Sequence, residues 1–208
     1  MNPADLPVLV IATRNSGKLR EFQTLLRSPD YDVRGLSDFP DGASGSEIEE
    51  SGSTFAENAC LKAVGYSLLI PFPVLADDSG LEVDALGGRP GIHSARYAGT
   101  DASDADRISK LTDELKNRTG DRSARFVCAL ALAKNGKVIT QAEGICSGVI
   151  ISEPRGAHGF GYDPVFLFPD MNKTFAELNE FEKNQHSHRF HAVVALQSLI
   201  VNYELFAL

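Results

Sequence analysis

Long apolar runs, paired cysteines and an excess of positive charge are all missing from this sequence, and each absence excludes a class of protein. No apolar run reaches the roughly 20 residues that a membrane-spanning helix needs, and residues 1–5 do not resemble the start of a signal peptide. The formal net charge of -8 argues against nonspecific binding to nucleic acid. We therefore expect a cytoplasmic protein with no membrane or nucleic-acid partner, although a small anionic substrate in a local basic pocket stays compatible with this charge.

The three cysteines, Cys60, Cys128 and Cys146, form no CxxC pair and lie far apart in the chain. Each belongs to an apolar or helical stretch, which is typical of buried free thiols in a reducing compartment. Metal-binding or redox roles are the alternative interpretation, which the sequence favours less.

Length and composition suit one globular domain, because 43% of the 208 residues are hydrophobic and can form a sizeable core. No internal repeat, low-complexity segment or linker marks a boundary, so residues 1–208 are predicted to be a single domain, in two lobes. Besides the elements described below, the patterns predict strands at residues 31–36, 124–133, 137–151 and 164–168, and helices at residues 103–117 and 174–178.

Two adjacent carboxylates, Asp77 and Asp78, follow a short apolar run at residues 73–76 that has the pattern of a buried strand. Ser79 and Gly80 are predicted to end this strand, and further Gly and Pro residues force turns soon after. Buried carboxylates repel each other and are costly to desolvate unless a cation or a hydrogen-bond donor offsets them. The pair therefore indicates either a charged site or an ordinary solvated turn, since Asp, Ser and Gly are common turn residues.

A basic loop with a glycine, at residues 14–18, connects a predicted strand at residues 7–13 to a predicted helix at about residues 19–27. Strand, loop and helix in this order direct free backbone N–H groups and Lys18 toward an anion. The loop is not a Walker A motif, which needs an earlier glycine and a hydroxyl residue after the lysine, where this chain has Leu19. A phosphate cradle of another kind and an ordinary turn with a solvated lysine both stay open.

A lysine occupies the core-facing side of the helix that is predicted at residues 54–69. Lys62 falls in the middle of the apolar stripe of this helix, where an unpaired buried charge is strongly destabilising. Its side chain must therefore either extend outward to solvent or contact anions inside the protein. The acidic candidates that flank the helix in sequence are Glu49, Glu50, Asp77 and Asp78. The loop that contains the two glutamates is either simply solvated or a source of oxygen ligands for a hard cation such as Mg²⁺.

A second loop rich in turn residues, at residues 154–164, places Phe160 between Gly159 and Gly161. The freedom of the backbone on both sides suits a ring that stacks on a flat ligand, and a ring packed into the core is the alternative.

The last predicted helix has Ser187 as its N-cap and ends near residue 203, so His188 and Arg189 lie in its first turn. Cations at this end of a helix oppose its dipole, and a bound anion or an acceptor-rich ligand would relieve the conflict. The histidines near this point do not have the spacing of a zinc site.

Eight short motifs, which together span nearly the whole chain, resemble in sequence and in order those of the inosine/xanthosine triphosphate pyrophosphatases, a family of house-cleaning nucleotide hydrolases. The motifs lie at residues 13–18, 49–50, 54–63, 76–80, 86–97, 159–165, 174–178 and 187–189. Any one of them alone is weak, whereas eight in the same order are highly specific.

This resemblance implies an α/β fold in which helices flank a long mixed central β-sheet and two lobes surround an active-site cleft, usually in a homodimer. It implies Mg²⁺-dependent cleavage between the α- and β-phosphates of ITP, dITP or XTP, which yields a nucleoside monophosphate and pyrophosphate. Such an enzyme removes non-standard purine nucleotides from the pool before they enter DNA or RNA.

The resemblance also implies a role for each matching residue. Asp78 would accept a proton from the attacking water, and Lys62 would contact the triphosphate. Mg²⁺ would be bound by Glu49 and Asp78, with Asp77 or Glu50 assisting. The phosphates would be bound by Thr13, Arg14, Asn15, Ser16, Gly17, Lys18 and Ser79. The base pocket would consist of Phe160, Gly161, Tyr162, Asp163, Lys183, His188 and Arg189.

Arginine and histidine donors that face a 6-oxo purine would accept inosine or xanthine and leave groups unpaired against adenine, a penalty that reaches about 10⁴-fold. Guanine is also a 6-oxo purine, so its rejection must depend on its 2-amino group, to which the sequence assigns no residue. The alternatives are a pyrophosphatase for pyrimidine or modified nucleotides and a nucleotide sensor without turnover. The base-pocket match counts against the first, and the joint presence of Asp78, Glu49 and Lys62 counts against the second.

Overall fold

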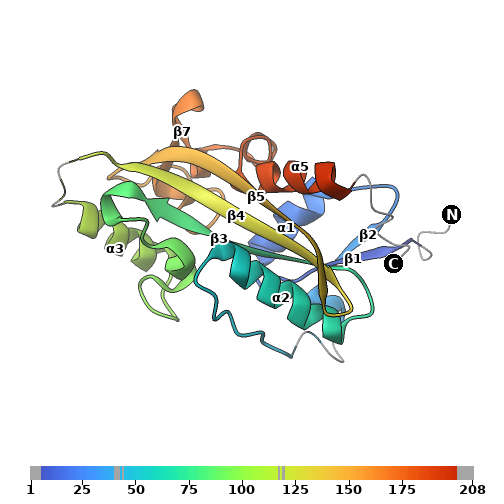
Figure 1. The fold of residues 1–208 in the computed structure, drawn as a ribbon. Coiled ribbons are helices and arrows are strands. Elements are labelled where there is room, and N and C mark those ends of the chain that lie inside the picture. The colour runs from blue at the N-terminus through green and yellow to red at the C-terminus, as the bar shows by residue number, and fades with distance from the viewer. Residues whose placement is uncertain (1–5, 40–42, 44, 117, 119, 201–208) are drawn as a thin grey trace. The chain divides into compact units, whose positions relative to one another are not determined.

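The computed structural model describes residues 6–39, 43, 45–116, 118 and 120–200. Helices flank a seven-stranded mixed sheet (Figure 1) with the strand order β2-β1-β3-β4-β5-β6-β7, which confirms the predicted α/β class. The strands are β1 (Val8–Ile11), β2 (Asp32–Gly35), β3 (Val74–Val83), β4 (Ser123–Lys134), β5 (Lys137–Ile150), β6 (Phe166–Phe168) and β7 (Lys173–Thr174). The α-helices are α1 (Ser16–Leu25), α2 (Phe55–Leu69), α3 (Asp104–Lys116), α4 (Glu180–Lys183) and α5 (His188–Ile200).

Short 3₁₀ helices complete the described structure, at Leu36–Asp38, Asp84–Leu86, Gly91–Arg96, Asp163–Val165, Pro169–Met171 and Phe175–Glu177. Strand β1 is parallel to both β2 and β3, whereas β6 is antiparallel to both β5 and β7. Parallel pairs need a long crossover connection, and the chain provides α1 between β1 and β2 and α2 between β2 and β3. Within the described residues, no helix is both long enough and apolar enough to span a membrane.

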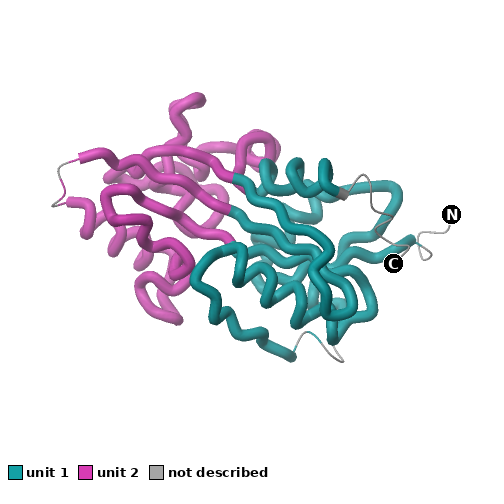
Figure 2. Tube along the Cα trace, in the orientation of Figure 1, with its two compact units in different colours: residues 1–78, 128–144, 189–208 teal, residues 79–127, 145–188 magenta. Residues whose placement is uncertain are grey.

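The chain divides into two compact units that interleave in sequence (Figure 2). Unit 1 consists of residues 1–78, 128–144 and 189–208, and unit 2 of residues 79–127 and 145–188. Each unit has its own apolar core. The single domain and the cleft between two lobes that the sequence led us to expect stay predictions.

Unit 1 has helices on two faces of its strands. One face packs against α1 and α5 in a cluster that contains Leu9, Ile11, Phe22, Leu26, Leu75, Leu130, Leu132, Ala192, Val193 and Leu196. Helix α2 covers the other face (Figure 1) with its buried side chains Phe55, Ala59, Ala63 and Tyr66. The strands are covered on both faces, which explains why β1 reads Val-Leu-Val-Ile without polar alternation.

The core of unit 2 is rich in aromatic side chains. Phe126 of β4, Phe166 of β6 and Phe175 form a cluster in which ring centroids lie 4.5 to 5.8 Å apart. The apolar side of α3, which includes Leu111 and Leu115, belongs to the same core. Aromatic pairs at these separations add a favourable geometry to the burial of their surface.

The predicted end of the strand at Ser79 was wrong, because β3 continues through Ser79 and Gly80 to Val83. The register of β1 against β3 covers Val74 and Leu75, so the part of β3 at Ser79 and Gly80 takes its pairing from β4, its other neighbour. This tertiary pairing overrides the local preference for a turn. Gly80 does not end the strand, and a glycine is required there because the surrounding atoms leave no room for a side chain. A Cβ atom at this position would lie 2.4 Å from Ser94 Oγ and 2.6 Å from the carbonyl oxygen of Gly91.

Gly80→Ala should therefore destabilise the protein by about 1–3 kcal/mol through overpacking. Urea unfolding followed by circular dichroism measures this loss. Gly45→Ala is the matched control, because a Cβ atom there meets no atom of the described residues within 4 Å, and its effect should stay within about 0.5 kcal/mol. Equal effects of the two substitutions would contradict the packing requirement at Gly80.

Candidate functional site

The adjacent carboxylates Asp77 and Asp78 lie in the middle of β3 and point to opposite faces of the sheet, because successive side chains of a strand alternate. Asp77 faces α1, where its Oδ2 atom lies 2.8 Å from Lys18 Nζ. Asp78 faces α2, where Asn58 Nδ2 donates to its Oδ2 atom at 3.1 Å and Lys62 Nζ lies 4.0 Å from its Oδ1 atom. The alternation lets each carboxylate have its own cation, so the predicted charged site, and not a solvated turn, is confirmed.

Helix α1 begins at Ser16, three residues before the predicted start at Leu19, because Asn15 caps it. The Asn15 Oδ1 atom accepts a hydrogen bond from the Lys18 N–H at 3.0 Å, as an N-cap residue does. Gly17 and its neighbours thus form the first turn, in which backbone N–H groups have no partner within the helix. The positive end of the helix dipole adds to these donors, so this helix start can bind an anion.

The loop before α1 is held in place by its own polar groups. Thr13 Oγ1 accepts a hydrogen bond from the Asn15 N–H at 3.2 Å, and Arg14 Nη2 donates to the carbonyl oxygen of Ser46 at 2.6 Å. The structure therefore brings Lys18 together with Asp77, and the phosphate-binding role of the loop stays a prediction.

A buried ion pair joins α1 to α5 and was missed in the sequence. Arg189 Nη1 lies 2.8 Å from Glu21 Oε2, and the two residues are 3% and 8% exposed. The loss of either partner would leave an uncompensated buried charge. In the sequence, this pair could have been suspected from Glu21, an acidic residue that lies beside Phe22 on the apolar side of α1. The base-binding role of Arg189 stays a prediction.

The pKa values of the two neighbouring carboxylates move in opposite directions. Burial raises the pKa of Asp77, but the attraction of three cations outweighs burial and lowers this pKa to about 2. The cations are Lys18, Lys62 and Arg189. Burial raises the pKa of Asp78 above its usual value, despite the attraction of Lys62 and Lys18. Asp77 is thus a firmly ionised partner of Lys18, whereas Asp78 is the more basic carboxylate and the better proton acceptor.

The acidic segment at residues 46–52 runs antiparallel along α2, and every second residue of the segment faces the helix. The contacts are, in order, Ser46 with Tyr66, Ile48 with Gly65, Glu50 with Lys62, and Gly52 with Asn58. The residues between them, Glu47, Glu49 and Ser51, are exposed. An extended segment turns alternate side chains to opposite sides, so this register decides which glutamate meets the helix.

Lys62 contacts anions inside the protein, which confirms one of the two alternatives that its position on the helix left open. Its Nζ atom lies 3.0 Å from Glu50 Oε1 and 4.0 Å from Asp78 Oδ1, and the side chain is 12% exposed. Burial lowers the pKa of Lys62, but attraction to nearby carboxylates outweighs this and raises it, so the ammonium stays charged. Glu50 is therefore the glutamate at the cation, and the metal-binding role of the exposed Glu49 stays a prediction.

Unit 2 contains a second charged group, which joins three of the predicted base-pocket residues. Lys183 Nζ lies 2.6 Å from Asp163 Oδ2, and both residues are buried. The same oxygen accepts a hydrogen bond from the Phe160 N–H at 2.9 Å, and the ammonium lies 4.8 Å from the centroid of the Phe160 ring. Gly159 is required beside them, because its φ is 74° and a Cβ atom would lie 2.0 Å from Asp163.

Three other predicted pocket residues, Tyr162, Gly161 and His188, contact other residues of unit 2. The contacts are the Tyr162 hydroxyl to the Ser94 carbonyl at 2.9 Å, the Gly161 N–H to Asp104 Oδ2 at 2.7 Å, and the His188 ring stacked on Phe126 with centroids 4.8 Å apart. Tyr162 and His188 are buried, and Ser79 is half-buried in β3. Asp104 was not predicted from the sequence, in which it looks like an ordinary first-turn residue of α3.

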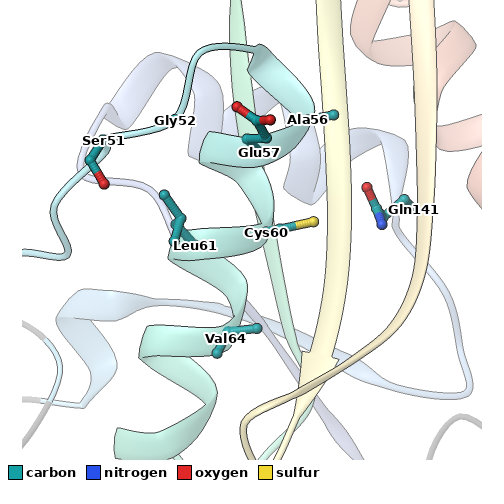
Figure 3. Close-up of a pocket in the computed structure, with 8 residues that line it drawn as sticks. All are labelled: Ser51, Gly52, Ala56, Glu57, Cys60, Leu61, Val64 and Gln141. Atoms are coloured by element: carbon teal, nitrogen blue, oxygen red, sulfur yellow. The ribbon is translucent and has the colours of Figure 1, made fainter.

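A separate hollow of about 550 Å³ lies beside α2 in unit 1 (Figure 3). Its lining is mostly apolar and consists of Ser51, Gly52, Ala56, Glu57, Cys60, Leu61, Val64 and Gln141. The predicted charged residues are not part of this lining, so the hollow is distinct from the ionic cluster. Cys60 is part of this lining and is half-buried, whereas Cys128 and Cys146 are buried. All three cysteines are free thiols, as predicted.

The model of the Ham1 family matches residues 9–199 of the chain. The chain belongs to the Ham1 family. Among its relatives, the dITP/XTP pyrophosphatase of Geobacillus kaustophilus is 54% identical over 189 residues, which cover 90% of this chain and 91% of the relative. The dITP/XTP pyrophosphatase of Bacillus subtilis is 47% identical over 192 residues, which cover 92% of this chain and 96% of the relative.

Solved structures of Ham1 proteins have the same fold. The Ham1 protein of Coxiella burnetii superposes with a TM-score of 0.84 at 43% identity, covering 94% of this chain and 98% of its own. The Ham1 protein of Staphylococcus aureus gives a TM-score of 0.81 at 44% identity, covering 93% and 97% of the two chains.

The lowered pKa of Asp77 predicts a specific loss of stability in acid. A carboxylate with a depressed folded-state pKa stabilises the fold above its unfolded pKa of about 4, and this contribution disappears as the pH falls toward 2. From pH 5 to pH 2, the free energy of unfolding should fall by about 2 kcal/mol more in the wild type than in Asp77→Asn.

Urea unfolding at a series of pH values measures this difference. Asp32→Asn is the control, because Asp32 forms an exposed pair with Arg34 at 2.8 Å, and such pairs contribute little. The control should keep the wild-type pH dependence. An Asp77→Asn variant with that same dependence would contradict the role given to the Lys18 pair.

Proposed function

We propose that this chain hydrolyses the non-standard purine nucleotides ITP, dITP and XTP to a nucleoside monophosphate and pyrophosphate, and so keeps them out of DNA and RNA. Its membership of the Ham1 family and its relatives named dITP/XTP pyrophosphatase support this function. The observation that carries the proposal is the ionic cluster of unit 1, in which two lysines and a basic carboxylate are held together by hydrogen bonds and ion pairs.

The cations of the cluster suit a triphosphate. Lys18 and the first turn of α1 bind phosphate oxygens, and Lys62 provides a second ammonium. The register of β1 against β3 ends at Leu75, before the two aspartates, and both lysines attract Asp78, so one substrate can lie between them. Negative charge moves onto the leaving pyrophosphate during the reaction, and cations that are already positioned stabilise that charge best. Carboxylates on both faces hold the lysines in place before substrate binds.

Asp78 is the proton acceptor in this proposal. Its pKa lies above the usual value of an aspartate, and a stronger base removes a proton from water more effectively. The neutral Asn58 donates to one of its oxygens, and Lys62 lies at 4.0 Å from the other, beyond hydrogen-bond distance. One oxygen therefore keeps lone pairs for water or for a metal ion.

Mg²⁺ is part of the proposal, and the carboxylates fit it. Among the described residues, no three His, Cys, Asp or Glu side chains form a ready-made metal site. Proteins usually bind Mg²⁺ through one or two carboxylates together with substrate phosphates and water, so a full protein cage is not required. Asp78 and either Glu49 or Glu50 would hold the ion, whereas Asp77 is engaged with Lys18. The ion would act as a Lewis acid toward the phosphates.

The base is recognised by unit 2 in this proposal. Lys183 and the Phe160 ring offer a donor and a stacking surface, and Asp163 fixes both. Donors from Lys183 and His188 suit the carbonyl oxygen of a 6-oxo purine and would oppose the amino group of adenine. A role of Arg189, which belongs to unit 1 and pairs with Glu21, stays a prediction. A homodimeric state and a cytoplasmic location belong to the same proposal and rest on the resemblance of the sequence motifs.

The test is pyrophosphate release in the presence of Mg²⁺ from ITP, dITP, XTP, GTP, ATP, CTP and UTP at equal concentrations. We expect kcat/KM for ITP, dITP and XTP to exceed that for ATP by about 10²–10⁴-fold, because adenine leaves the donors of the pocket unpaired. Release of orthophosphate would refute the reaction. A preference for pyrimidines would refute the base pocket, and no turnover of any nucleotide would favour a binding protein.

A further inference from the structure

Asn58 is a fully buried polar residue of α2 to which the sequence motifs assign no role. It is 1% exposed and lies one helical turn before Lys62. Its Nδ2 atom donates to Asp78 Oδ2 at 3.1 Å, and its Oδ1 atom accepts a hydrogen bond from the Gly52 N–H at 2.8 Å. The amide therefore joins the proposed base to the segment that carries Glu50.

The chemistry of the two partners fixes the orientation of this amide. The backbone N–H of Gly52 can only donate, and the ionised carboxylate of Asp78 can only accept. Only one of the two flipped positions of the Asn58 side chain satisfies both partners. A buried amide with both ends paired is rigid, because rotation would leave polar groups without hydrogen bonds.

The acidic segment can approach the Oδ1 side of Asn58 closely only because residue 52 is a glycine. A Cβ atom on Gly52 would lie 2.7 Å from Asn58 Oδ1 and 2.7 Å from Glu57 Cβ. No side chain larger than hydrogen fits there without displacing the segment or the amide. The chain thus keeps Gly52 and Asn58 in direct contact at the point where the acidic segment meets the start of α2.

Asn58 and Lys62 form two parallel bridges between the acidic segment and Asp78, one neutral and one charged. The Asn58 amide holds the Oδ2 atom of Asp78, and the Oδ1 atom is directed to the side of Lys62.

We propose that Asn58 is a positioning residue for the hydrolytic reaction, which fixes the rotation of the Asp78 carboxylate and its separation from the Glu50–Gly52 part of the acidic segment. This inference rests on the proposed function, because that function gives Asp78 a proton to accept. Small errors in the placement of a reacting group lower the rate of the chemical step more than they weaken substrate binding.

The test compares Asn58→Ala and Asn58→Asp with the wild type in steady-state hydrolysis of ITP. Asn58→Ala should lower kcat about 10–100-fold per folded molecule, with KM changed less than about threefold. Asn58→Asp keeps the size and the acceptor for the Gly52 N–H but has no amide donor for Asp78, so it should lose at least as much. Calorimetric binding of α,β-methylene-ITP should stay within about threefold of the wild type.

Ser67→Ala is the matched control on the same helix. Ser67 is also buried, 2% exposed, and its Oγ atom accepts a hydrogen bond from the Gly136 N–H at 2.9 Å. Its loss should lower the melting temperature but leave kcat per folded molecule unchanged. Wild-type kcat in Asn58→Ala or Asn58→Asp, or an equal loss of kcat in Ser67→Ala, would overturn the positioning role. A wild-type protein that hydrolyses no nucleotide would instead overturn the proposed function itself, and with it this inference.

Discussion

Two buried carboxylates on consecutive residues of a central strand are the constraint on which unit 1 depends. A buried carboxylate is tolerated only when cations or donors offset its lost hydration. Because strand side chains alternate, Asp77 and Asp78 place this demand on opposite faces of β3. Each face must therefore supply its own positive partner, which is Lys18 on one side and Lys62 on the other.

The surrounding elements are arranged to meet this demand. On the face of Asp77, the Asn15 cap sets the first turn of α1, and the buried pair of Glu21 with Arg189 ties α1 to α5. On the face of Asp78, the acidic segment lies along α2 and balances the charge of Lys62. The two neighbouring aspartates therefore differ in pKa: that of Asp77 is lowered, so it stays ionised, and that of Asp78 is raised, so it accepts a proton more readily. Carboxylates whose pKa values are moved apart in this way suit acid–base chemistry.

The sequence predicted those features that depend on local periodicity. The 100° spacing of a helix placed Lys62 on the core-facing side, and the structure confirms that it meets anions there. Features set by distant partners could not be predicted. The strand through Ser79 depends on pairing with β4. The contact of Lys62 with Glu50, and not with Glu49, depends on the register of the acidic segment against α2. The pair of Glu21 with Arg189 joins residues 168 positions apart, for which no local pattern exists.

Turnover of ITP by the Asp78→Asn variant tests most directly whether this carboxylate performs the chemistry. The variant keeps the size of the side chain but cannot accept the proton, so kcat should fall by about 10²–10⁴-fold. Binding of α,β-methylene-ITP should be largely retained, which separates loss of catalysis from loss of the site. Full wild-type turnover in Asp78→Asn would contradict the account, because the basic carboxylate around which the cluster is built would then have no catalytic role.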